Sequence, residues 1–102
     1  MNREKANRLW FKSEVTRRIV ALGAQRDDNR DEYTLQTTAG LLHVSPYDGW
    51  IACRFDEPKR AIAEPRLNPV SGKWNHHYGP FSSRADAQWA VDWFFNDLGR
   101  YL

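Results

Sequence analysis

The sequence predicts an α+β fold, in which an antiparallel sheet of about four strands carries N- and C-terminal helices packed on one face. Apolar residues recur at helical spacing near both ends of the chain, and residues alternate in strand fashion between them. Turn residues separate the alternating runs. Because 102 residues is the usual size of one domain, we expect a single domain over residues 1–102.

The first predicted element is a helix over residues 3–22. One apolar stripe supports it, made of Phe11, Val15, Ile19 and Leu22 at spacings of four, four and three. Gly23 follows where a C-terminal cap belongs. Several residues of the second half are β-branched, so a strand after a break near Ser13 is the alternative interpretation.

A series of strands is predicted to follow the helix. Residues 25–32 are polar throughout and predict an exposed connection. Alternation over 33–37 and 41–44, with Ala39-Gly40 between them, predicts a hairpin. A turn over 45–49, with Asp-Gly as its strongest signal, leads to a third strand over 50–55.

The segment before the last helix carries weaker signals. Residues 56–69 hold three prolines, which leaves room for only a short helical turn around 59–63. A turn over 68–72 then precedes a fourth strand over 73–78, which ends at Gly79-Pro80.

The C-terminal helix has the clearest pattern. Ser83 is the predicted N-cap, and the buried stripe is Ala87, Val91, Phe94, Leu98 and Tyr101. Trp89 and Trp93 form a second stripe one turn apart. We expect the first helix to pack on that flank, and a homodimer through Trp89 and Trp93 is the alternative.

Alternation also predicts which side chains leave the helices and face outward. The predicted outward set is Thr34, Gln36, His43, Trp50, Arg54 and either Asn75 with His77 or Trp74 with His76. Antiparallel sheets often leave one face in water, so a solvated surface is the simplest interpretation. Aromatic, arginine and amide groups together also suit recognition.

Composition excludes several functional classes. The formal net charge is +2, too small to indicate nucleic acid or anionic lipid by itself. No apolar run is long enough to span a membrane and no signal peptide is evident, so we expect a cytoplasmic protein without membrane contact. The single cysteine, Cys53, excludes an internal disulfide and fits a reducing compartment.

No residue pattern indicates catalysis, so we expect a protein that is not an enzyme and carries no cofactor or metal. A site of two histidines with Asp48 or Asp56 lacks a metal-binding spacing. Cys53 with His43 would be a nucleophile and base, but a cysteine in an apolar strand is usually inert. The pair Asp31-Glu32 belongs to a charged loop, where carboxylates are ordinary solvated acids.

Two binding functions remain. The favoured one is binding of another protein through the outward sheet face and residues 71–77, with contacts from Trp50, Arg54, Lys73, Trp74, Asn75 and His77. The alternative is nucleic-acid binding by a basic first helix carrying Arg8, Lys12, Arg17 and Arg18. Residues 1–26 hold seven basic and two acidic side chains, whereas 27–57 hold two and seven, so the acidic middle would repel phosphates.

Two segments carry a resemblance to known sequences. The run from Trp50 to Ala61, followed by Asn68 to His77 with its Ser-Gly-Lys-Trp-Asn piece, resembles small uncharacterised accessory proteins of bacterial plasmids, phages and other mobile elements. It covers about a third of the chain. The resemblance implies an accessory role, such as modulating a host or defence protein, and brings no catalytic residue with it.

Overall fold

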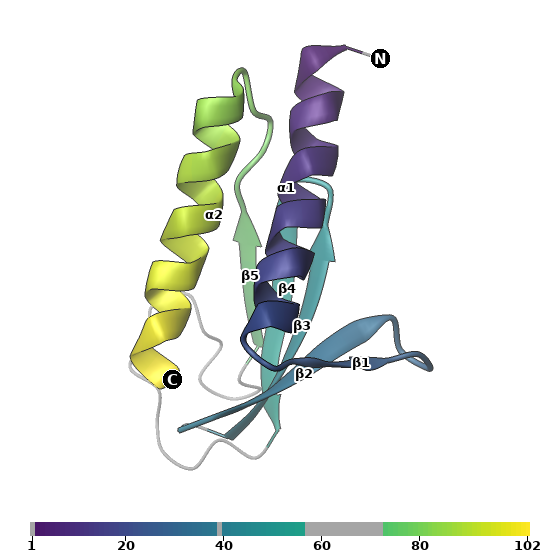
Figure 1. Ribbon diagram of the computed structural model, residues 1–102, viewed down its shortest axis with the longest axis vertical. Coiled ribbons are helices and arrows are strands. Elements are labelled where there is room, and N and C mark those ends of the chain that lie inside the picture. Colours follow the sequence, from purple (N-terminus) through teal and green to yellow (C-terminus); the bar gives the residue numbers. More distant parts are fainter. Residues whose placement is uncertain (1, 39, 57–72) are drawn as a thin grey trace.

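The computed structural model describes residues 2–38, 40–56 and 73–102, with the backbone alone for residues 56 and 73–77. Helices α1 (Arg3–Ala21) and α2 (Arg84–Leu98) lie side by side on one face of an antiparallel sheet (Figure 1). The strands are neighbours in chain order: β1 (Gln25–Asp27), β2 (Glu32–Thr37), β3 (Gly40–Tyr47), β4 (Trp50–Asp56) and β5 (Lys73–His77). The predicted α+β fold, with both terminal helices on one face, is confirmed.

Both helices begin at the residues that their capping groups indicate. The Asn2 side chain accepts a hydrogen bond from the Lys5 backbone N–H at 2.8 Å, and Ser83 Oγ accepts one from the Asp86 N–H at 3.1 Å. The chain leaves α1 through Gly23, whose φ of +98° favours glycine. The first element is therefore a helix, and the alternative strand is wrong. A short 3₁₀ turn, η1 (Gly99–Tyr101), follows α2.

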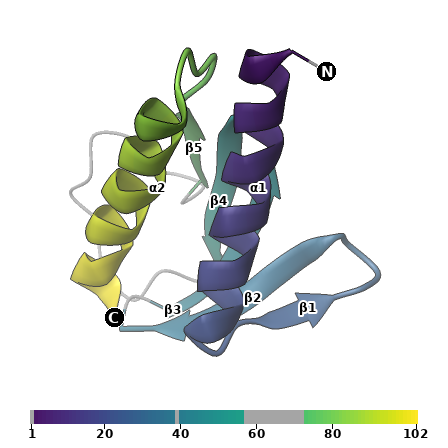
Figure 2. The same ribbon diagram turned by 45° about the horizontal axis from the view of Figure 1, so that its top comes forward.

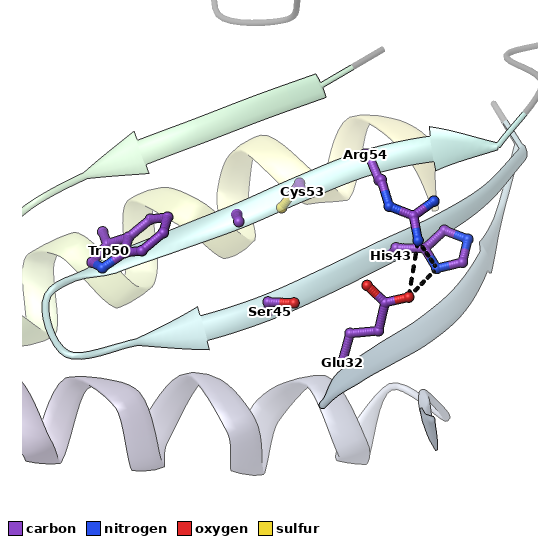
Figure 3. A pocket seen from close by; sticks show the side chains of 7 residues that line it. Glu32, His43, Ser45, Trp50, Cys53 and Arg54 are labelled. Atoms are coloured by element: carbon purple, nitrogen blue, oxygen red, sulfur yellow. Dashed lines mark hydrogen bonds and ion pairs between the residues drawn. The ribbon is translucent and has the colours of Figure 1, made fainter. Parts of the chain in front are cut away.

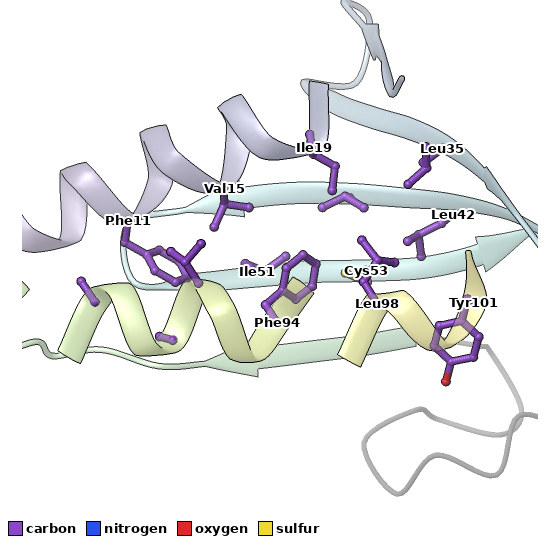
Figure 4. Packing of buried hydrophobic residues seen from close by; sticks show 14 of the residues in the cluster. Phe11, Val15, Ile19, Leu35, Leu42, Ile51, Cys53, Phe94, Leu98 and Tyr101 are labelled. Carbon is purple, nitrogen blue, oxygen red and sulfur yellow. The ribbon is translucent and has the colours of Figure 1, made fainter. Parts of the chain in front are cut away.

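The core lies between the helices and the sheet (Figure 4). Phe11, Val15 and Ile19 of α1 are fully buried. The predicted C-terminal stripe is buried as well: Ala87, Val91, Phe94 and Leu98 lie on α2, and Tyr101 lies in η1 beyond it. Burial of each Val, Leu, Ile or Phe side chain among them contributes about 1.5–3 kcal/mol. Leu22 is an exception, 43% exposed, because α1 ends at Ala21.

The polar run after α1 is not merely a loop. Gln25–Asp27 forms the edge strand β1, paired antiparallel with Glu32–Thr34 of β2. Arg26 stabilises the connection by pairing with Asp28 at 2.9 Å and Asp31 at 2.8 Å. A short edge strand that is mostly solvent-exposed has no apolar alternation, so its sequence looks like a loop. Figure 2 shows the β1–β2 hairpin extending sideways past the end of α1.

The second turn is shorter than predicted. Residues 45–47 continue β3, where Pro46 pairs with Ile51 and Tyr47 pairs with Trp50. The reversal is confined to Asp48-Gly49, and Gly49 has a φ of +91°. The helical turn expected around 59–63 and the turn over 68–72 lie outside the described residues.

The flank of α2 that carries Trp89 and Trp93 does not face α1, so that expectation is wrong. Instead α1 contacts the opposite flank, where Arg18 pairs with Asp92 at 3.0 Å and its guanidinium lies over the Phe95 ring at 4.3 Å. Trp89 is 63% exposed. Within the part of the chain that is described, neither helix has the length and apolar character needed to cross a bilayer.

Candidate functional site

The face of the sheet opposite α1 and α2, here called the helix-free face, carries Thr34, His43 and Arg54, which alternation predicted to face outward. Register places His43 opposite Arg54, and Thr34 opposite His43. It also pairs Arg54 with Lys73. These four positions, Thr34, His43, Arg54 and Lys73, form a row across β2 to β5, called the polar row below.

An aromatic pair lies at the other end of this face. Tyr47 and Trp50 are register partners beside the β3–β4 turn, and their rings stack with centroids 4.2 Å apart and planes 14° apart. Trp50 is half-buried and Tyr47 is 38% exposed. Because β4 rises about 3.3 Å per residue, the aromatic pair and the polar row are roughly 13 Å apart.

Small side chains between the polar row and the aromatic pair leave a hollow. Ser45 and Ala52 are register partners at this level, and Asn75 pairs with Ala52. The hollow has a volume of about 290 Å³. Trp50 lines one end, and Glu32, His43 and Arg54 line the other (Figure 3).

A carboxylate from β2 organises the polar end of the hollow. Glu32 Oε1 lies 2.8 Å from His43 Nδ1 and accepts a hydrogen bond from Arg54 Nη2 at 3.0 Å. Because an ionised carboxylate only accepts hydrogen bonds, the Nδ1 proton belongs on His43 and points to Glu32. Arg54 Nη2 lies 3.2 Å from His43 Nδ1 because both nitrogens donate to the same oxygen, Glu32 Oε1.

The cluster is largely buried. The side chains of Glu32 and His43 are 10% and 8% exposed, and that of Arg54 is 29% exposed. Separating the Glu32 carboxylate from the Arg54 guanidinium would be costly, because each group would lose its partner and water could not fully replace it. The cluster therefore holds the Arg54 guanidinium in one orientation at the rim of the hollow.

Glu32 is the site residue that sequence reasoning missed. It was assigned to a charged loop of solvated acids, but it begins β2 and is buried. A signal for it does exist in the sequence. Extending the alternation of 33–37 back by one residue places Glu32 on the same side as Thr34, which is opposite His43.

The other predicted contact residues lie on β5. Register pairs Asn75 with Ala52 and His77 with Trp50, which selects this pair over Trp74 with His76. Trp74 instead pairs with Cys53, a residue of the buried core. The side chains of 73–77, and with them any contacts of Lys73, Trp74, Asn75 and His77, lie outside what the structure describes.

Cys53 is separated from His43 by the sheet itself. The thiol belongs to the core cluster and Cys53 pairs with Val44, whereas His43 faces the other side. Burial, together with the negative charge of Asp97, raises the pKa of Cys53 well above its ordinary value. A thiol that stays protonated in the core is not a nucleophile at neutral pH.

Three of the four α1 residues predicted to bind nucleic acid are paired with carboxylates. Arg8 pairs with Glu4 at 2.8 Å, and Arg17 pairs with Glu14, whose pKa is lowered by that hydrogen bond. Arg18 pairs with Asp92 on α2, as described above. Lys12 is exposed. A phosphate backbone would therefore have to displace three carboxylates to reach these arginines.

Arg8 differs from the other basic residues of α1 because it reaches the β3–β4 turn. With Glu4, Asp48 and Trp50 it lines a second hollow of about 360 Å³, so Trp50 lies between two concave surfaces. The mixed charges of this second hollow do not single out a ligand.

On the α2 flank, Trp89 and Trp93 stack with centroids 6.1 Å apart, and Trp93 also contacts Tyr78 edge-on at 6.2 Å. The two tryptophans belong to α2, which lies on the other face of the sheet from the helix-free face (Figure 1). Among the described residues, no group of three potential metal ligands occurs. Comparison with known proteins gives no matching family model, curated protein or solved structure.

Proposed function

We propose that this protein binds another protein through its helix-free face, without catalysing a reaction. One observation carries the proposal. A half-buried Trp50 lies at one end of the hollow, and Arg54, hydrogen-bonded to Glu32, lies at the other end. Tryptophan and arginine are the residue types most enriched at interface hot spots. Side chains already ordered before binding lose little entropy when a partner docks.

The proposed contact surface includes β5. Lys73, Asn75 and His77 are at register positions opposite Arg54, Ala52 and Trp50, so the strand extends the face beyond β4. The resemblance to accessory proteins of mobile elements would make the partner a host or defence protein in the cytoplasm. The alternative, nucleic-acid binding by α1, is disfavoured because Arg8, Arg17 and Arg18 are already paired with carboxylates.

An affinity capture with matched variants tests the proposal. Tagged wild-type protein, Trp50→Ala, Arg54→Ala and Trp89→Ala are incubated with bacterial lysate, and retained proteins are identified by mass spectrometry. Trp89 is the matched control because it is an exposed tryptophan on α2, away from the helix-free face. We expect a protein that wild-type and Trp89→Ala retain and that both other variants lose, with circular dichroism unchanged. If the Trp50→Ala and Arg54→Ala variants retain the same proteins as the wild type, the interface lies elsewhere.

A further inference from the structure

We draw no further inference here: the strongest candidate, the surface patch on the flank of α2 where an exposed Trp89 stacks on Trp93, is an apolar face for which nothing in the described part of the chain shows what covers it.

Discussion

Oε1 of Glu32 is 2.8 Å from Nδ1 of His43 on the neighbouring strand, and the same oxygen accepts a hydrogen bond from Arg54. A single buried carboxylate thus connects three strands, β2, β3 and β4, on the face that carries no helix. This arrangement orients Arg54, the side chain that we propose as a main contact with the partner.

Replacing Glu32 by Gln should destabilise the fold, because the amide keeps the size of the side chain but loses its charge. His43 and Arg54 would then share a neutral amide oxygen in place of a charged carboxylate, at a mostly buried position. We expect a loss of about 1–3 kcal/mol in the free energy of unfolding, measured by urea denaturation. Glu14→Gln is the control, since its partner Arg17 is largely exposed, and its effect should be much smaller. Equal losses would contradict a structural role for Glu32.

Two glycines give a matched test of the β3–β4 turn. Gly49 has a φ of +91°, and a Cβ there would lie 3.4 Å from Arg8 Cδ. Gly49→Ala should therefore cost about 1–2 kcal/mol of stability, because L-residues with a side chain avoid this conformation. Gly99→Ala has open space around the new Cβ and a φ of −55°, so it should be neutral or slightly stabilising. Thermal unfolding of both variants checks the contrast.

The Cys53 thiol should react slowly in the native protein. Burial is the main cause of its raised pKa, and Asp97 adds to it. At pH 8 we expect little reaction with a disulfide reagent until urea unfolds the chain, after which one thiol per chain should react. Rapid labelling under native conditions would place the thiol outside the core.

The same pKa shift predicts how stability changes with pH. In the unfolded chain the thiol ionises near its ordinary value of 9.0, whereas the folded state keeps it protonated. Ionisation therefore favours the unfolded state, and this contribution to stability should fall as pH rises above 9.0. Urea denaturation of wild-type and Cys53→Ala at pH 8 and pH 10 measures it. The decline should be smaller in the variant.

Oligonucleotides should cause no salt-sensitive quenching of tryptophan fluorescence. Three arginines of α1 are paired with carboxylates, and phosphates would have to replace those partners. A titration with single- and double-stranded DNA and RNA, at low and physiological salt, checks this. Quenching that weakens with salt and disappears in the double variant Arg17→Gln, Arg18→Gln would instead support nucleic-acid binding.

The elements with strong periodicity were predictable from the sequence. The stripes of α1 and α2 repeat at helical spacing over several turns, so their buried residues follow directly, from Phe11 to Ile19 and from Ala87 to Tyr101. The central strands alternate, which placed Trp50 and Arg54 together on the helix-free face. Local patterns were sufficient here because burial of one face selects apolar residues at every second position of a strand and at every third or fourth position of a helix.

Features set by tertiary contacts were not predictable in the same way. Glu32 follows a run of solvated acids, and only its contact with His43 and Arg54 shows that it is buried. Leu22 matches the helical stripe but falls one residue beyond α1. Which flank of α2 faces α1 depends on how α1 lies across the sheet. The residue pattern of α2 alone carries no information about that.

Site-specific photo-crosslinking tests most directly whether the helix-free face is the binding surface. A benzoylphenylalanine replaces Tyr47, at the rim of this face, or Trp89 on α2, and both positions are exposed enough to accept it. After irradiation in bacterial cells, we predict a crosslinked partner from position 47 and none from position 89. Crosslinks from position 89 alone, whether to another protein or to a second copy of this chain, would contradict the account and move the interface to α2.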